Sequence, residues 1–201
     1  MSAKQTMTSE EALRLLVEGN ARFAAGKPKR PHCTVDRRME VASGQSPFTV
    51  IVSCSDSRVP PEIVFDCGIG DLFVVRVAGN VVDSAVIGSL VLAVNHFGCP
   101  LVVVLGHESC DAISVALSSD EALIREPVPV IKMAEMIREN IPESLAETAR
   151  DDAAVTRAVR EHIASVVRQI VEEPFIAERI AEGMTRVIPA YYSLAKGTVL
   201  W

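Results

Sequence analysis

The stretch Leu101–Cys110, with the sequence LVVVLGHESC, decides the fold of this chain of 201 residues. Its first five residues are apolar, rich in β-branched side chains and free of polar alternation, which is typical of a parallel strand buried on both faces. A second stretch, Phe48–Arg58, repeats the arrangement as FTVIVSCSDSR. Each apolar run therefore predicts a central strand that leads directly into reactive side chains.

Apolar runs and helical patterns alternate along the rest of the chain. A third run, Leu72–Val77, also predicts a central parallel strand. Parallel strands need crossover helices, and we expect these at Pro61–Asp66 and Ser84–Phe97. A further helix is expected at 8–25, where Thr8 and Glu11 form a capping box at its start. Other helices are expected at 111–117, 130–138, 152–171 and 174–182. A terminal hairpin is expected at 187–200. The chain is thus predicted to be an α/β protein.

The composition excludes several classes of protein. A chain of this length is expected to form one domain over residues 1–201, with a helical arm over residues 1–30. The formal charge is −6, and no stripe of basic and aromatic residues indicates nucleic acid binding. No apolar run approaches the length of a membrane span, and the polar N-terminus lacks the apolar core of a signal peptide. Five scattered cysteines indicate a reducing compartment, so we expect a cytoplasmic location.

Three potential metal ligands follow two of the predicted strands. Cys54 comes directly after the run that starts at Phe48, and His107 and Cys110 follow the run 101–105. In an open parallel sheet the carboxyl ends of neighbouring strands share one crevice, so the fold can bring all three side chains together. Two thiolates and an imidazole fill three of the four tetrahedral positions that Zn²⁺ prefers and leave the fourth for water or substrate, which predicts a catalytic zinc site. The residues without such a context are expected to be structural: Cys33, Cys67 and Cys99 as thiols, and His162 as a partly buried packing residue of its helix.

Asp56 and Arg58 add a charged pair beside the Cys54 ligand. Residues two apart in an extended segment project to the same side, so the two side chains can form a bidentate ion pair. The Asp56 carboxylate can orient a metal-bound hydroxide, or it can bind the metal itself and block it. We expect Arg58 to decide between these states by holding Asp56 off the metal, and a plain surface ion pair is the alternative.

The chain resembles the β-class carbonic anhydrases in four segments: Cys54–Val59, Gly106–Cys110, Arg76–Asn80 and the ending Ala190–Val199. The resemblance extends from about Ser9 to the C-terminus. It implies that Zn²⁺ is bound by the two cysteines and the histidine named above, with the aspartate and arginine pair beside it as catalytic residues. The implied reaction is the reversible hydration of CO2 to bicarbonate and a proton by zinc-bound hydroxide.

The same resemblance implies a fold, an assembly and a substrate pocket. The fold is a central four-stranded parallel sheet flanked by helices, with an added antiparallel C-terminal strand. A homodimer or homotetramer is expected, with the active site near the subunit interface. The residues assigned to substrate binding are Gln45, which reaches the partner's pocket, together with Phe73, Ala78 and Gly79. Gly79 and Asn80 are also expected to form a turn with left-handed backbone.

Three residues depart from the pattern of the family: Asp111, where a glycine is usual, Val77 and Leu92. We expect Asp111 to cap the following helix, although its carboxylate can also disfavour hydroxide at the metal or face solvent. These departures leave open the hydrolysis of carbonyl sulfide or carbon disulfide on the same scaffold, and also a weakly active zinc-binding homologue. A structural or regulatory metal site without catalysis is a further alternative.

Overall fold

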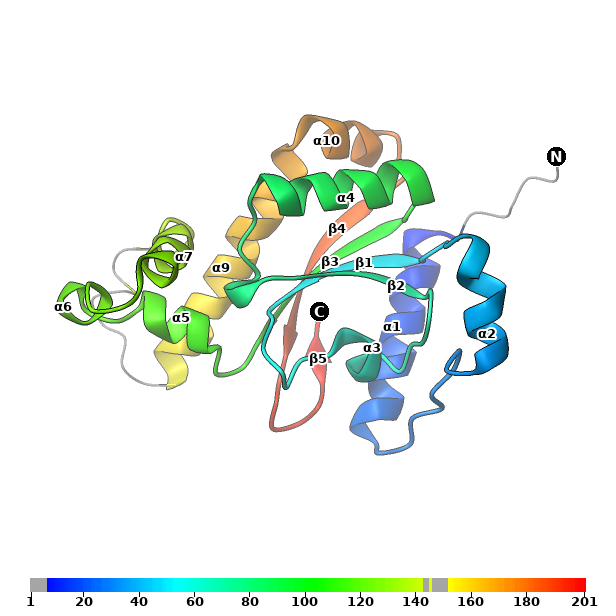
Figure 1. The fold of residues 1–201 in the computed structure, drawn as a ribbon, viewed down its shortest axis with the longest axis horizontal. Coiled ribbons are helices and arrows are strands. Elements are labelled where there is room, and N and C mark those ends of the chain that lie inside the picture. The colour runs from blue at the N-terminus through cyan, green and yellow to red at the C-terminus, as the bar shows by residue number, and fades with distance from the viewer. Residues whose placement is uncertain (1–6, 143–144, 146–151) are drawn as a thin grey trace.

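The structure of the protein is a computed structural model that describes residues 7–142, 145 and 152–201. Within these residues lies a five-stranded sheet in the order β2-β1-β3-β4-β5 (Figure 1). The strands up to β4 are parallel, and β5 pairs antiparallel with β4. The strands span Thr49–Ser53 (β1), Leu72–Arg76 (β2), Leu101–His107 (β3), Arg186–Tyr192 (β4) and Val199–Leu200 (β5). The predicted α/β class, with a parallel sheet and an added antiparallel C-terminal strand, is confirmed.

Alternate residues of the central strands face two separate hydrophobic cores. On β3, Val102 and Val104 belong to the core on one face, and Leu101, Val103 and Leu105 belong to the core on the other. All five side chains are completely buried. Burial on both faces explains why the run contains no polar position.

Helices cover both faces of the sheet. The core on one face is closed by α4 (Ser84–Phe97), α5 (Asp111–Ala116), α6 (Asp120–Leu123), α7 (Val128–Arg138), α9 (Asp152–Glu172) and α10 (Pro174–Ala181). The core on the other face is closed by α1 (Ser9–Ala24) and α3 (Pro61–Val64). The remaining short elements are α2 (Val35–Glu40) and the 3₁₀ turns η1 (Val41–Ser43) and η2 (Ala78–Asn80). In the part of the chain that the structure describes, no helix is long and apolar enough to span a membrane.

The helix ends follow local side-chain chemistry. Thr8 caps α1, because its Oγ1 accepts the N–H of Glu11 at 3.2 Å and the Glu11 carboxylate accepts the N–H of Thr8 at 2.8 Å. The α4 helix stops at Gly98, whose φ is 64°. Both ends agree with the prediction. The α3 helix is shorter than predicted and ends at Val64, because Asp66 has a φ of 47° and its carboxylate is held by the connection that follows α1.

The position of β2 differs from the prediction of a central strand. In the described sheet β2 lies at the edge and pairs with β1 alone. Its residues 72–75 are half-buried rather than fully buried. An apolar run indicates burial but does not specify which strands are neighbours, so the three runs look alike in sequence. The interpretation of Leu72–Val77 as a central strand is therefore wrong.

Gly106 allows α9 to lie directly on β3. A Cβ at this position would lie 2.4 Å from Cδ1 and 2.7 Å from Cγ1 of Ile163, and 3.0 Å from Cγ1 of Val159. Both α9 side chains are buried. The missing side chain thus sets the distance between helix and strand at the residue that precedes His107.

We expect the Gly106→Ala substitution to lower the free energy of unfolding by about 1–3 kcal/mol, the usual cost of overpacking a core. Ile163→Val removes Cδ1, the atom nearest the new methyl group. The double variant should therefore be less destabilised than the sum of the two single variants. Urea denaturation of the four proteins measures this coupling, and strictly additive effects would contradict the proposed contact.

Candidate metal centre

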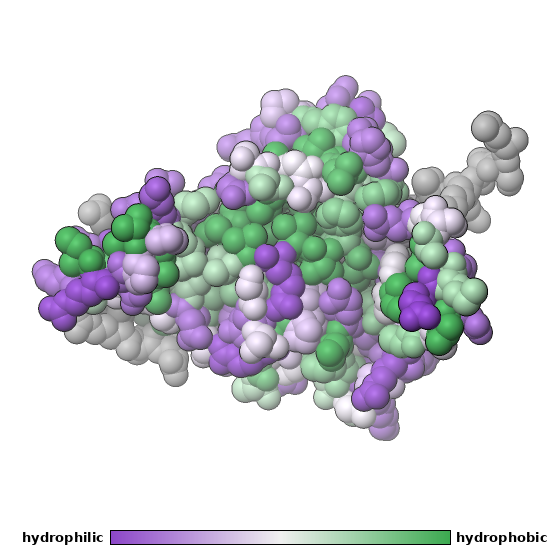
Figure 2. Space-filling view, in the orientation of Figure 1, coloured by the Kyte–Doolittle hydropathy of each residue, from purple (hydrophilic) through white to green (hydrophobic). Residues whose placement is uncertain are grey.

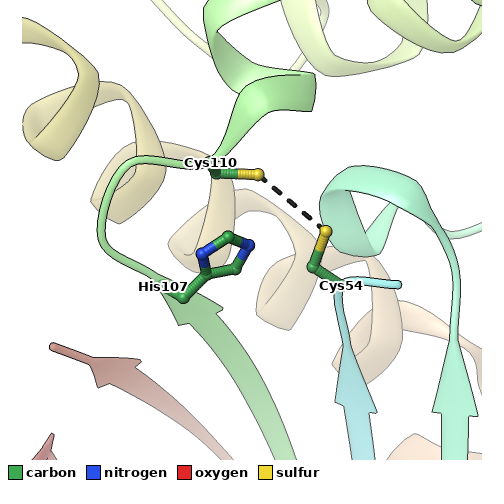
Figure 3. Close-up of side chains that lie close together, drawn as sticks. All are labelled: Cys54, His107 and Cys110. Atoms are coloured by element: carbon green, nitrogen blue, oxygen red, sulfur yellow. Dashed lines mark hydrogen bonds between the residues drawn. The ribbon is translucent and has the colours of Figure 1, made fainter. Parts of the chain in front are cut away.

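Cys54, His107 and Cys110 meet at the carboxyl ends of β1 and β3, which are neighbours in the sheet. Cys54 follows β1, His107 is the last residue of β3, and Cys110 is the N-cap of α5. Their ligand atoms all lie within 4.8 Å of one another, and all three side chains are buried (Figure 3). The two Sγ atoms are 4.0 Å apart. The parallel sheet thus brings the three candidate ligands to one point.

The imidazole of His107 has a free nitrogen that faces the two sulfurs. Nδ1 lies 2.9 Å from the carbonyl oxygen of Glu108, so Nδ1 carries the proton and donates it. Nε2 is buried and has no hydrogen-bond partner among the described residues. Figure 3 shows this side of the ring turned toward the cysteines. A buried nitrogen without a hydrogen bond is costly, and a metal ion between it and the two sulfurs would satisfy it, so the residues fit Zn²⁺.

The three side chains alter one another's pKa values. The hydrogen bond with Cys110 lowers the pKa of Cys54 to about 4, against the effect of burial. The same hydrogen bond, together with burial, raises the pKa of Cys110. Burial disfavours the charged form of His107, but Cys54, the carbonyl oxygen of Glu108 and the Asp56 carboxylate together outweigh this effect, and the His107 pKa is raised. The neighbours of Cys54 therefore favour its thiolate, which is the form that binds a metal ion.

Asp56 and Arg58 form a bidentate ion pair beside these ligands. Arg58 Nε donates to Oδ1 at 2.9 Å, Nη2 donates to Oδ2 at 2.6 Å, and the backbone N–H of Arg58 donates to Oδ1 at 2.8 Å. Nη2 also donates to the carbonyl oxygen of Ser109 at 3.1 Å, which joins the two loops that carry the candidate ligands. The hydrogen bonds from Arg58 are the main cause that lowers the pKa of Asp56 to about 2. Its carboxylate is therefore ionised at neutral pH.

Arg76 contributes a contact that the sequence did not indicate. From the end of β2, its Nε donates to the carbonyl oxygen of Cys54 at 3.1 Å, and its Nη2 donates to the carbonyl oxygen of Asp56 at 2.6 Å. One guanidinium thus fixes the backbone on both sides of Ser55. Arg76 is the first residue of a segment that carries the family resemblance. An arginine at the end of a strand does not, however, indicate from the sequence which carbonyl groups accept its hydrogen bonds.

Gly79 lies against the sulfur of Cys54. Its N–H donates to Cys54 Sγ at 3.3 Å. Its φ of 65° confirms the expected left-handed turn. A Cβ here would lie 2.7 Å from Ile137 Cδ1 and 3.1 Å from Ala112 Cβ. Both the backbone conformation and the lack of space require glycine, and glycine is what lets this N–H approach the sulfur.

The four residues assigned to substrate binding do not all lie together in one chain. Ala78 is half-buried next to Gly79. Phe73 is half-buried near the start of β2, with its ring centroid 6.0 Å from that of Phe97. Gln45 is exposed in the segment before β1, at the opposite end of that strand from the candidate ligands. Within its own chain, the metal centre therefore adjoins Ala78 and Gly79 but not the other two residues.

Asp111 does not cap α5, contrary to the prediction. The N-cap is the candidate ligand Cys110, which has an extended backbone. Asp111 is the first residue of the helix, and its side chain is exposed. A carboxylate in the first turn is still favoured by the helix dipole. Its charge also helps to raise the pKa of Arg58, after the larger effect of the hydrogen bonds with Asp56. Of the other departures, Val77 is half-buried and Leu92 on α4 is 44% exposed.

The parallel α/β fold places a donor set that could bind a metal ion at the carboxyl edge of the sheet, where ligands bind in proteins of this class. Residues 49–199 match the family model described as carbonic anhydrase. Carbonic anhydrase 2 of Mycobacterium tuberculosis is 40% identical over 187 residues, which cover 92% of this chain and 89% of that protein. The chain belongs to the carbonic anhydrase family.

Two further similarities agree with this assignment. The carbonic anhydrase of Mycolicibacterium smegmatis is 39% identical over 189 residues, which cover 94% of this chain and 90% of that protein. Among solved structures, a tetrameric β-carbonic anhydrase from the filamentous ascomycete Sordaria macrospora superposes with a TM-score of 0.73 at 23% identity, covering 94% of this chain and 95% of that chain. The fold is that of the β-class enzymes, so the resemblance stated from the sequence is confirmed.

We expect the Arg58→Ala substitution to raise the pKa of Asp56 from about 2 toward the ordinary value of about 3.9, because it removes the main hydrogen bonds to the carboxylate. In the wild type, the stabilisation from ionised Asp56 is present above about pH 4 and is lost as the pH falls toward 2. A pH titration of the Asp56 carboxyl ¹³C resonance in the metal-free protein measures the shift. Arg14→Ala, which removes an exposed pair with Glu18, is the matched control. An unchanged Asp56 pKa in Arg58→Ala would contradict the role of Arg58.

Proposed function

We propose that the protein catalyses the reversible hydration of CO2 to bicarbonate and a proton, with Zn²⁺ bound by Cys54, His107 and Cys110. The observation that carries this proposal is the position of Asp56. Its Oδ2, held by Arg58, lies 3.9 Å from the unpartnered Nε2 of His107. A reacting water at this point of the site would have an ionised acceptor within reach. Membership of the carbonic anhydrase family supports the same reaction.

Zn²⁺ is the proposed metal because two sulfurs and one imidazole nitrogen form a donor set that is typical of zinc. The three donors are buried, and two thiolates would balance the charge of the ion. When bound, Zn²⁺ supplies a Lewis acid that lowers the pKa of a coordinated water to near 7. Three protein donors match the number found at catalytic rather than structural zinc sites.

Asp56 orients the reacting water in this proposal. Its pKa of about 2 makes the carboxylate too weak a base to remove a proton from water, but it leaves a full charge for accepting a hydrogen bond at Oδ2. That hydrogen bond directs the oxygen lone pair toward CO2. Arg58 holds both carboxylate oxygens, which keeps Asp56 from turning onto the metal.

The CO2 pocket is proposed to combine residues from two subunits. CO2 is neutral and has no net dipole, so apolar walls suit it better than charged ones. Ala78 and Gly79 supply such a wall beside the sulfur of Cys54. Gln45 and Phe73 lie away from the metal ligands of their own chain, and we propose that they serve the site of a partner subunit.

We further propose that the chain assembles as a homodimer or homotetramer through the open edge of β2. Among the described strands β2 pairs on one side alone, so its outer backbone groups are available for contacts. Phe73, Val75 and Val91 are partly exposed hydrophobic residues on β2 and α4, where Figure 2 shows a hydrophobic surface. A surface of this kind is typical of an interface between proteins. The Sordaria macrospora relatives are described as tetrameric.

A cytoplasmic location is proposed on the basis of the cysteines. All five cysteines are free thiols. Free thiols, two of them in a candidate metal site, suit a reducing compartment.

Purified protein loaded with Zn²⁺ is expected to hydrate CO2 in proportion to its zinc content, as measured by stopped-flow with a pH indicator. Asp56→Asn keeps the size of the side chain but removes the charge of the acceptor, so we expect kcat/KM to fall by about 100-fold or more at unchanged zinc content. Asp36→Asn, on the exposed surface of α2, should hydrate CO2 at the wild-type rate. Full zinc occupancy without CO2 hydration would contradict the proposal, and carbonyl sulfide and carbon disulfide would then be the substrates to assay.

We expect one Zn²⁺ per chain, measured by elemental analysis after dialysis. Cys54→Ser and Cys110→Ser each remove a thiolate, and they should weaken Zn²⁺ binding by more than about 100-fold, the upper end of the loss seen when an outer partner of a ligand is removed. Cys33→Ser, at an exposed thiol outside the site, is the control and should leave the zinc content unchanged. Equal zinc content in all these variants would show that the metal is bound elsewhere.

A further inference from the structure

His162 on α9 is joined to the sulfur of Cys54 through the backbone of Gly79. The Nε2 atom of His162 lies 2.7 Å from the carbonyl oxygen of Gly79, and the N–H of Gly79 donates to Cys54 Sγ at 3.3 Å. His162 is 1% exposed. The expectation of a partly buried packing residue is therefore wrong, because the ring is fully buried and makes a polar contact next to the metal centre.

The hydrogen bond between His162 and Gly79 fixes the tautomer of the ring. A carbonyl oxygen accepts, so Nε2 must carry the proton and donate it. Nδ1 is then left as an acceptor, and it is buried with no hydrogen-bond partner in the described ranges of the chain. Burial lowers the pKa of His162 to about 4, so the ring is neutral near neutral pH. A single neutral tautomer that donates from Nε2 is the state that the contacts require.

The position of His162 is fixed by the packing of its neighbour Ile163. Ile163 lies directly on Gly106, where a Cβ would lie 2.4 Å from its Cδ1. Gly106 immediately precedes His107 in β3. A shift of α9 that moved His162 away from Gly79 would have to open this close-packed contact. The α9 helix is thus held in place by the strand that supplies a candidate ligand.

Gly79 needs an external contact to keep its orientation. Glycine has no Cβ to restrict its φ and ψ angles, and the left-handed φ of 65° is one of several conformations open to it. Ile137 and Ala112 leave no room for a side chain that would stiffen the backbone. The N–H and the carbonyl of Gly79 belong to successive peptide groups, so the hydrogen bonds to Cys54 and from His162 together fix its φ and ψ angles. A change in these angles that released the carbonyl would leave it buried without a partner.

We propose that His162 is a positioning residue of the metal centre, whose hydrogen bond to the Gly79 carbonyl holds the Gly79 N–H on the sulfur of Cys54. This inference rests on the proposed metal site. A hydrogen bond to a ligand sulfur withdraws electron density from it and so tunes its donation to the metal ion. Outer partners of metal ligands change metal affinity by about 10- to 100-fold. The same hydrogen bond also holds the Cys54 sulfur in place beside the other two candidate ligands. Loss of the His162 donor therefore weakens metal binding through lost preorganisation, although every ligand remains.

Co²⁺ in place of Zn²⁺ reports on the sulfur directly, because thiolate-to-Co²⁺ charge-transfer absorption depends on the energy of the sulfur lone pair. We expect His162→Leu to move this absorption to longer wavelength and to weaken Zn²⁺ binding, in competition with a chelator, by about tenfold. His162→Gln places an amide N–H at a similar reach from the backbone and should restore both values. Circular dichroism and thermal unfolding establish that the variants are folded.

Equal absorption and affinity in the wild type and His162→Leu would overturn the inference, as would a His162→Gln variant that behaves like His162→Leu. If the leucine variant does not fold, His162→Met, with a more flexible side chain, takes its place with the same expected result. The wild type also gives a test without substitution. Its ¹⁵N NMR spectrum must show the Nε2–H tautomer of His162, and the Nδ1–H tautomer would overturn the inference. A wild-type protein that binds neither Co²⁺ nor Zn²⁺ would instead contradict the proposed function, and this inference with it.

Discussion

The parallel pairing of β1 with β3 is the constraint on which the metal centre depends. Ser53 lies opposite Leu105, so Cys54 leaves β1 while β3 continues to His107. A sulfur from one strand and an imidazole from the next therefore meet without a long loop, and the short turn to Cys110 adds the second sulfur. A slip of one residue between the strands would turn His107 to the other face of the sheet. The register of two fully buried strands therefore fixes the relative positions of the candidate ligands.

Groups from separate segments hold several of the polar atoms at this edge of the sheet, while Nε2 of His107 has no hydrogen-bond partner among the described residues. A carboxylate, two sulfurs and an imidazole are costly to bury unless each has a partner. Arg58 holds the Asp56 carboxylate and reaches the loop after β3, Arg76 holds the loop after β1, and Gly79 donates to a sulfur. The hydrogen bond between Arg58 and Asp56 lies within one loop, and each of the others connects a different pair of segments. A displacement of one loop would therefore break contacts to its neighbours, which keeps the ligands preorganised for a metal ion.

Contacts between residues close in sequence could be predicted, and most contacts between distant segments could not. Asp56 and Arg58 are two residues apart, and their pairing was expected from the alternation of an extended chain. The pairing is present, but the segment is a turn in which the N–H of Val59 donates to the carbonyl oxygen of Asp56, so the expected reason was wrong. The edge position of β2 depends instead on which strands pair, and an apolar run does not encode its neighbours. His162 repeats the spacing of a buried helix face, and nothing in that spacing indicates that the carbonyl of Gly79 lies beside it. The contacts of Arg76 could not be predicted either. Its acceptors are backbone carbonyl groups, which every residue has, so the sequence does not indicate which of them it binds.

The β2 strand connects the metal centre with the proposed assembly. Its last residue, Arg76, donates to the loop that carries Cys54, yet in a single chain Arg76 is exposed and water competes for its donors. Its open edge and half-buried Phe73 are the surface that we assign to a second copy. A subunit that covered this edge would exclude water from the same strand, and hydrogen bonds strengthen when water is excluded. The loop that carries Cys54 would therefore be held more firmly in the assembled protein than in a single chain.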